Sequence, residues 1–326
     1  IDTGKWPTTK VQISPRIGFS WDVLGDKSLK FRGGTGLFTG RLPLVFFTNM
    51  PTNSGMVQNV AAITTYYKDG VASPDALLQH FKGDMITDVT KLLEKMNELN
   101  PKKFPTTITP EDGVLPSSFA AVDPKFKMPQ VWKTSLAVDY TVPTPFPFTV
   151  SAEGIFNKTV NGVVLRDWSV MSTEGFARFN GVDNRPIYEN YQQKDANGKN
   201  LPSAYVLENT HKGYGYSGTL TVNMRPIESL SLMAAYTHTV SKEVTGMPGS
   251  NASSVLNYIG TVYGPNDPGL HNSQYVTPDR VVASVTINDK SNNHFSFIYE
   301  GWRGGANYSY MTANDMNGDG YNYDLI

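Results

Sequence analysis

The sequence has 326 residues, a formal net charge of −1 at pH 7 and a pI of about 6.6, so its charge indicates no nucleic-acid partner. It contains no cysteine, which excludes a disulfide framework, a thiol nucleophile and a thiolate metal site. No apolar run reaches the roughly 18 residues of a transmembrane helix, but membrane-spanning strands are short alternating segments that do not give that signal.

Alternation of apolar and polar residues predicts eight strands, in keeping with a composition of 12% aromatic residues, 29 glycines and 21 prolines. The predicted strands are about Arg16–Leu24, Leu29–Thr39, Val131–Val142, Phe148–Asn157, Tyr214–Met224, Ser229–Val240, Asp279–Asn288 and Phe295–Trp302. The fourth strand's pattern continues into 163–168, past Asn161-Gly162, a dipeptide that favours a hairpin turn.

The hairpin of residues 279–302 shows the alternation most clearly. Each of its strands has about ten residues, the length that a tilted strand needs to cross a bilayer. One face is apolar and aromatic, and the other is mixed with polar groups. A soluble sheet with one wet face gives the same alternation, so this hairpin alone leaves membrane and water open.

The lengths of the connections separate the two alternatives. Four hairpins have short turns, and long segments at about 40–130, 169–213, 241–278 and 303–326 join or follow them. In an up-and-down arrangement all short turns lie at one rim and all long loops at the other. This asymmetry predicts an all-β, antiparallel up-and-down transmembrane β-barrel with long extracellular loops. A soluble β-sandwich, the alternative, would have turn signals every 8 to 12 residues on both sides.

One helix is predicted inside the first long loop, from Pro74 to Leu99. Its apolar residues recur at three- and four-residue spacing, Ser73 or Asp75 would cap its start, and Pro101 would end it. We expect this helix to pack on its own loop; the alternative is part of a lid or a partner surface.

The best local motif for a metal site is Asp315-x-Asn317-x-Asp319-Gly320. Oxygen ligands at loop positions 1, 3 and 5 with glycine at 6 are typical of a calcium loop. The backbone carbonyl of Tyr321 and the carboxylate of Asp324 would complete the candidate calcium site. Position 12 is not a glutamate, so the loop is no complete EF-hand. The alternative is a tight turn closed by its own side-chain hydrogen bonds.

Candidate substrate-binding residues are aromatic side chains in the long loops. These are Trp168, Tyr188, Tyr191, Tyr205, Tyr258 and Tyr263. Such rings stack on sugars or peptides, although they also serve to pack loops. The five histidines are scattered without metal-ligand spacing, and no Gly-x-Ser-x-Gly motif occurs. We therefore predict no catalytic residues and no enzyme activity.

Four segments resemble TonB-dependent outer-membrane receptors, in particular the large Bacteroidetes receptors of the Oar-like and SusC-like kind. The segments are 13–22, 29–41, 277–284 and 315–326. The resemblance implies a barrel of about 22 strands closed by a plug domain, which imports large nutrients with energy from TonB and the proton gradient. Residues 1–326 would be a partial barrel domain without the plug.

The resemblance also implies a location and partners. The location is the bacterial outer membrane, and the partners are its lipids, TonB through a plug domain outside this chain, and a surface lipoprotein of the SusD-like kind. The expected function is uptake of a large nutrient such as a glycan, a peptide or a chelate. Two alternatives stay open: a soluble or surface β-domain that binds carbohydrate or matrix, and a carbohydrate-active enzyme with acidic residues in its loops.

Overall fold

A computed structural model describes residues 2–56, 65–68, 71–74, 85–107, 109, 116–170, 172–189, 194–198, 200–259, 261–289, 291, 293–304, 314–321 and 324. The chain divides into two compact units, Ile1–Ser54 with Phe119–Ile326, and Gly55–Ser118. The predicted substrate-binding residue Tyr191 lies outside the described residues.

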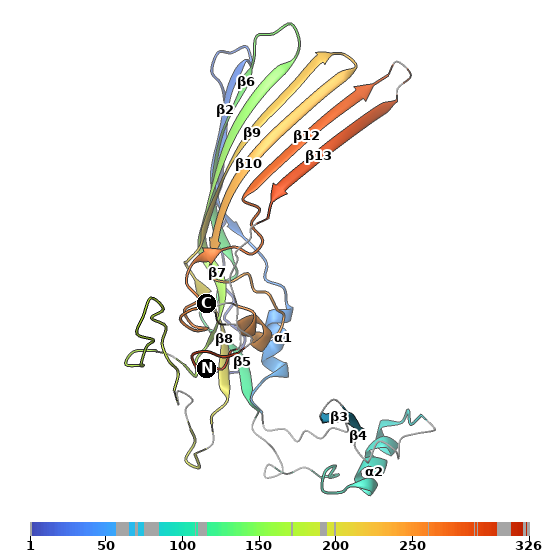
Figure 1. The fold of residues 1–326 in the computed structure, drawn as a ribbon, viewed down its shortest axis with the longest axis vertical. Coiled ribbons are helices and arrows are strands. Elements are labelled where there is room, and N and C mark those ends of the chain that lie inside the picture. Colours follow the sequence, from blue (N-terminus) through green and yellow to red (C-terminus); the bar gives the residue numbers. More distant parts are fainter. Residues whose placement is uncertain are drawn as a thin grey trace. The chain divides into compact units, whose positions relative to one another are not determined.

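The larger unit is built on one antiparallel sheet, whose main path we call the wall (Figure 1). The strand order is β1-β2-β6-β7-β9-β10-β12-β13, so each strand pairs with the preceding strand of the wall. The bounds are β1 Arg16–Asp22, β2 Leu29–Thr39, β6 Gln130–Thr141, β7 Phe148–Asp167, β9 Tyr214–Ile227, β10 Leu230–Glu243, β12 Asp279–Asn288 and β13 His294–Arg303. All eight predicted strands are confirmed. The wall is an open sheet over the described residues, with β1 and β13 at its edges.

The connections sort as the sequence predicts. Short turns at 23–28, 142–147, 228–229 and 289–293 join the strands of each hairpin, and the connections at 40–129, 168–213 and 244–278 are long. In the first turn, both carboxylate oxygens of Asp22 accept hydrogen bonds from the backbone nitrogen of Lys27, and Gly25 adopts a φ of 76°. Because neighbouring strands are antiparallel, every short turn lies at one rim of the wall and every long loop at the other.

Register gives the wall two chemically different faces. One row across the sheet, which represents the apolar face, consists of Trp21, Phe31, Val138, Ala152, Leu220, Tyr236 and Val281. The adjacent row on the opposite, polar face consists of Ser20, Arg32, Ala137, Glu153, Thr219, Thr237 and Arg280. On the polar face the Nε of Arg32 lies 3.0 Å from Asp139 Oδ2. An apolar outside and a polar inside are what a membrane barrel requires.

The sequence-based prediction for β7 is confirmed for the length of the strand and wrong for a turn within it. This strand runs through 20 residues without a turn, so the predicted extension past residue 162 is confirmed. A hairpin turn at Asn161-Gly162 is wrong, because the second half of β7 pairs with β8 (Ser203–Thr210), and β8 pairs with β5 (Ser118–Val122). Asn161 is buried in the sheet, and its side-chain amide donates to Gln130 Oε1 at 2.7 Å. Pairing with β8 thus overrides the local turn preference.

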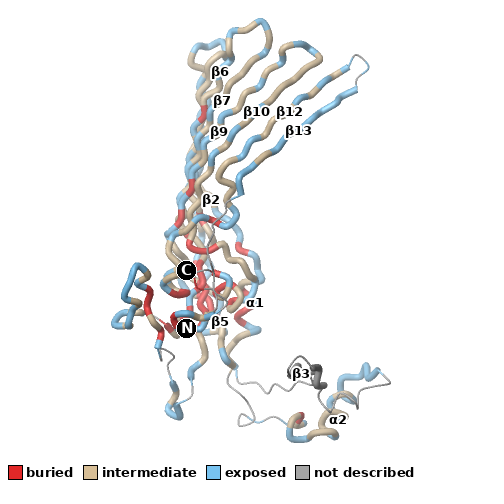
Figure 2. The backbone as a smooth tube through the Cα atoms, viewed as in Figure 1, coloured by how far each residue is buried: buried red, intermediate tan, exposed pale blue. Residues whose placement is uncertain are grey.

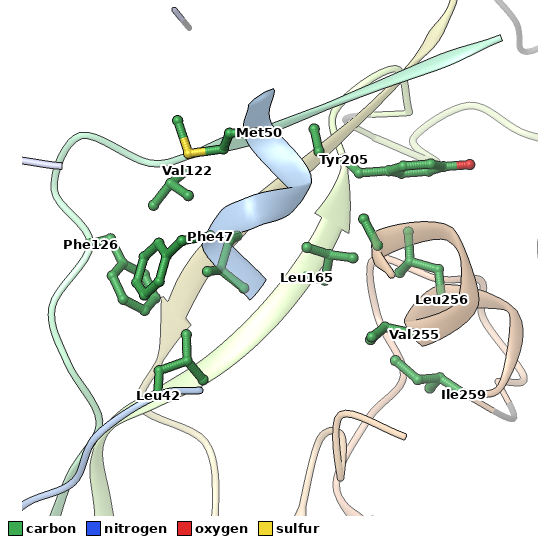
Figure 3. Packing of buried hydrophobic residues seen from close by; sticks show 13 residues of the cluster. Leu42, Phe47, Met50, Val122, Phe126, Leu165, Tyr205, Val255, Leu256 and Ile259 are labelled. Carbon is green, nitrogen blue, oxygen red and sulfur yellow. The ribbon is translucent and has the colours of Figure 1, made fainter. Parts of the chain in front are cut away.

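The long loops form their own hydrophobic core, which we call the loop core (Figure 3). It joins β5, β8 and the end of β7 to the short helices α1 (Val45–Thr52) and α3 (Ala252–Asn257). Its buried residues are Leu42, Phe47, Met50, Ala120, Val122, Phe126, Leu165, Tyr205, Leu207, Ala252, Val255, Leu256 and Ile259. Figure 2 shows buried residues concentrated among these loops and sparse in the wall. The short strand β11 (His271–Asn272) adds to the end of β10.

The smaller unit contains a hairpin, β3 (Thr65–Lys68) with β4 (Val71–Pro74), and the helix α2 (Val89–Leu99). The predicted helix therefore exists, but its start and its cap at Ser73 are wrong, since Ser73 and Pro74 belong to β4. Asp88 caps α2 instead, because its Oδ1 accepts hydrogen bonds from Thr90 N at 2.9 Å and Lys91 N at 3.3 Å. The other predicted cap, Asp75, lies outside the described residues. None of the described helices is both long and apolar enough to cross a membrane.

Candidate ligand-binding site among the long loops

A cavity of about 400 Å³ opens among the long loops of the larger unit, and we call it the Trp168 pocket. It is formed by the end of β7, the segment that follows it, β8, and residues 263–267. The lining residues are Arg166, Trp168, Val170, Ser172, Thr173, Arg178, Pro186, Tyr188, Glu208, Tyr263, Pro265, Asn266 and Asp267. Aromatic, charged and amide groups converge on it, as is usual for a small-molecule site.

Trp168 is held in a fixed orientation by β8. Its backbone nitrogen donates to Ala204 O at 2.7 Å, and its indole Nε1 donates to Glu208 Oε1 at 2.5 Å. The other carboxylate oxygen of Glu208 lies 3.5 Å from the Nε of Arg166. These bonds restrict the indole ring to one position, so the loss of side-chain entropy on ligand binding is small.

Tyr188 forms a buried side of the pocket and is only 4% exposed. Its hydroxyl donates to Tyr263 O at 2.9 Å, and its ring meets that of Phe176 edge-on at 5.3 Å. Gly264 packs against it with a φ of 104°, and a Cβ at this position would lie 2.0 Å from the Tyr188 hydroxyl oxygen. Only glycine satisfies both the backbone angle and the close approach.

Asn266 links the lining segment 263–267 to the end of β7 by hydrogen bonds. Its side-chain oxygen accepts from Asp167 N at 2.7 Å, and its Nδ2 donates to Asp167 O at 2.7 Å and to Val170 O. Asp167 is itself buried, and its Oδ1 accepts from Ser169 N and Ala204 N. The polar groups of Asn266 and Asp167 on this side of the pocket are therefore hydrogen-bonded within the protein, and the pocket is preformed.

The structure brings three of the six predicted aromatic residues together, since Trp168, Tyr188 and Tyr263 all line this pocket. Tyr205 is buried in the loop core, where burial raises the pKa of its hydroxyl. Tyr258 follows α3 and is 57% exposed away from the pocket lining. Sequence reasoning missed the charged lining residues, Arg166, Arg178, Glu208 and Asp267, because no motif marks them.

The predicted calcium loop closes on itself through its own side chains. Asp315 accepts hydrogen bonds from Gly318 N at 2.7 Å and Gly320 N at 2.8 Å, and Asn317 Oδ1 accepts from Asp319 N at 3.2 Å. Both glycines have positive φ, at 78° and 86°. This geometry matches the alternative drawn from the sequence, a tight turn satisfied by its own side chains.

The two remaining predicted ligands, Tyr321 and Asp324, contact other residues of the long loops. Tyr321 packs against the loop core, and its hydroxyl donates to Asp167 Oδ2 at 3.3 Å. Asp324 Oδ2 accepts from Met316 N at 2.6 Å, and its Oδ1 lies 3.3 Å from the Nη1 of the buried Arg185. The guanidinium of Arg185 thus places positive charge next to the Asp324 carboxylate, where a calcium ion would otherwise bind.

Burial dominates the electrostatics of this loop. Burial, together with the smaller effect of the nearby carboxylates of Asp324 and Asp315, raises the pKa of Asp319 to about 7. Burial also raises the pKa of Asp324. Among the residues with described side chains, no group of three or more His, Cys, Asp or Glu is arranged to hold a metal ion. Calcium binding stays a prediction.

The family of the protein follows from comparison with known proteins. Residues 2–317 match the family described as an outer membrane beta barrel domain, so the chain belongs to this family. Its location is therefore the bacterial outer membrane, which sets aside the soluble alternative and places the apolar face of the wall in lipid. No curated protein matches the sequence.

Two solved structures have low overall similarity to this chain. The outer membrane transporter YddB from Escherichia coli has a TM-score of 0.43 and 10% sequence identity, with 87% of this chain and 28% of that chain covered. The siderophore receptor PirA from Pseudomonas aeruginosa has a TM-score of 0.31 and 9% identity, with 89% and 36% covered. The chain thus spans about a third of the length of either protein.

Proposed function

We propose that this protein is a TonB-dependent transporter or receptor that captures a large nutrient in the Trp168 pocket. The observation that carries the proposal is the position of the pocket. It lies among the long loops at one rim of the wall, where the extracellular mouth of an outer-membrane barrel is found.

The pocket chemistry favours a polar ligand with apolar faces, such as a sugar or a peptide. Tyr263 is 49% exposed, and Trp168 is oriented by Glu208, so both present surfaces for stacking. Two arginines and two carboxylates line the same cavity and supply donors and acceptors without a dominant charge. Glycans and peptides combine these two requirements.

The test uses the purified receptor and a panel of oligosaccharides and peptides, with affinity measured by calorimetry. Trp168→Ala removes the stacking surface, and we expect it to weaken binding about tenfold, which corresponds to about 1.4 kcal/mol. Tyr258→Ala is the matched control, because Tyr258 is an exposed loop aromatic outside the pocket. Equal affinities for the two variants and the wild type would place the ligand elsewhere.

Energised transport is proposed from the resemblance to TonB-dependent receptors, and so are the plug domain and the SusD-like lipoprotein as partners. We expect that loss of the proton gradient abolishes uptake by cells but leaves surface binding intact. Uptake that continues without the gradient would contradict TonB dependence. Binding is noncovalent in this proposal, so the ligand is recovered unchanged; release of cleaved products, abolished by one Asp or Glu substitution, would instead support an enzyme.

Calcium remains part of the proposal as a ligand of the 315–324 loop, through Asp315, Asn317, Asp319, Asp324 and the carbonyl of Tyr321. Tyr321 connects this loop to the core, and Tyr188 N donates to Asn317 O at 2.6 Å, so the loop supports the pocket wall. Bound calcium would raise the melting temperature, and EDTA would lower it. A melting temperature that EDTA leaves unchanged counts against calcium.

A further inference from the structure

A row of four side chains crosses the apolar face of the wall near its long-loop rim. Trp132 on β6 pairs with Lys158 on β7, Lys158 pairs with Tyr214 on β9, and Tyr214 pairs with Lys242 on β10. All four therefore point to the same face as Leu220 and the other apolar residues, two positions apart along each strand. Aromatic and cationic residues alternate along this row.

The two lysines are exceptional on this face. Among the described strand residues of the apolar face, the only other lysine or arginine is Arg303, whose Nη2 lies 2.8 Å from Asp279 Oδ2. Within the described part of the chain, neither Lys158 nor Lys242 forms an ion pair. Lys158 is exposed and Lys242 half-buried, so their positive charge is available to a ligand outside the barrel.

The position of the row matches the headgroup level of a membrane. Trp132 and Tyr214 are 42% and 37% exposed, and aromatic rings of this kind anchor a barrel at the interface between lipid tails and headgroups. Lysine side chains beside them lay their methylene stems along apolar surface and extend the ammonium group into the headgroup layer. Near the short-turn rim, the described strand residues of the same face include no lysine.

We propose that Lys158 and Lys242 bind the phosphate groups of a phosphorylated glycolipid in the outer leaflet, with Trp132 and Tyr214 packed against its apolar part. The long-loop rim faces the cell exterior, so the row meets the outer leaflet. The lysines stand two strands apart, about 10 Å between Cα atoms. Two ammonium groups at this spacing reach two phosphates of one headgroup, and their charge complements it.

The test measures lipid retention by the complete receptor in nanodiscs, with diphosphorylated lipid A as the probe. The double variant Lys158→Gln with Lys242→Gln should lose roughly fivefold in affinity per lysine, about 25-fold together. Lys133→Gln is the matched control, because Lys133 lies next to Trp132 but faces the opposite side, with Nζ 5.8 Å from the Phe38 ring centre. It should retain lipid like the wild type.

Further arms identify the ligand and exclude misfolding. Dephosphorylated lipid A should bind the wild type as weakly as the double variant binds the probe, and inorganic phosphate should not compete. A Lys158→Arg, Lys242→Arg variant keeps the charge and should restore retention. Equal retention by the double variant and the wild type, equal binding of dephosphorylated lipid, competition by inorganic phosphate, or no restoration by a folded arginine variant would each overturn the proposal. Nutrient affinity of the Trp168 pocket should stay unchanged, so this result is independent of the proposed transport function.

Discussion

The wall and the loop core are stabilised by different means. β1 and β13 of the wall consist almost entirely of exposed residues, and a hydrogen-bond ladder across eight strands holds the wall together. The loop core instead buries 13 apolar residues between short helices and strands, as a small soluble domain does. One chain thus uses lipid as the partner for its apolar residues in one region and its own side chains in the other.

The largest difference is expected from one apolar truncation in each region. Leu256 is 1% exposed in the loop core, and Leu256→Ala should destabilise the loop cluster by about 3 kcal/mol, because a cavity remains. Leu220 is 51% exposed on the apolar face, so Leu220→Ala should cost well under about 1 kcal/mol, since lipid fills the space. Limited proteolysis in urea measures the first effect and heat-modified gel mobility the second. Equal costs at the two positions would contradict the comparison.

Substitution by lysine distinguishes the apolar face of the wall from the polar face. Leu220→Lys should destabilise the folded barrel by about 2 kcal/mol, because it places an ammonium group in lipid. The neighbouring Thr221 belongs to the polar face, and Thr221→Lys should be close to neutral. Refolding titrations into vesicles provide the measurement. A larger loss from Thr221→Lys than from Leu220→Lys would reverse our assignment of the faces.

The 315–324 loop makes the stability of the loop cluster depend on pH. The folded pKa of Asp319 is raised to about 7 from 3.8, so the folded state binds more protons than the unfolded state between these values. Stability should therefore fall by about 1.5 kcal/mol as pH rises from 5.5 to 7, and change little above. Hydrogen exchange of residues 315–321 in EDTA reports this change. Asp319→Asn should remove it, and the same slope in that variant would disprove the assignment to Asp319.

The smallest expected effect concerns the shape of the pocket. Gly264→Ala adds a Cβ against the Tyr188 hydroxyl at a positive φ, so Tyr188 must move and ligand affinity should fall about tenfold. Gly269→Ala is a useful control, because Gly269 also has positive φ but has open space around it. Loss of affinity in Gly269→Ala alone would show that backbone strain, rather than contact with Tyr188, matters.

The sequence predicted the wall well because its strands have two unlike faces. The alternation in 279–302 is visible in neighbouring residues of the sequence. The unequal lengths of the connections follow from the number of residues between the predicted strands. β5 and β8 were not predicted, since both lie in long connections and mostly buried runs such as Ala204–Leu207 show no alternation. Asn161-Gly162 favoured a turn locally, but pairing of Gly162 with Thr210 is a long-range contact.

Only the aromatic part of the candidate site was predictable. Loop aromatics are conspicuous in a sequence, and three of them line one cavity. Two of their charged neighbours are positioned by the register between β7 and β8, where Val164 lies opposite Glu208 and the Glu208 carboxylate lies near Arg166. Tyr205 lies in the loop core and not in this pocket, and its burial there is a tertiary property that no local sequence pattern shows.

Orientation of the two rims tests the central claim most directly. The protein has no cysteine, so single cysteines can be introduced at the exposed loop residue Ala196 and the exposed short-turn residue Glu228. On intact cells a membrane-impermeant maleimide should label Ala196→Cys at once and Glu228→Cys only after the outer membrane is opened. Labelling of both residues on intact cells, or of Glu228→Cys alone, would contradict a wall with all long loops outside.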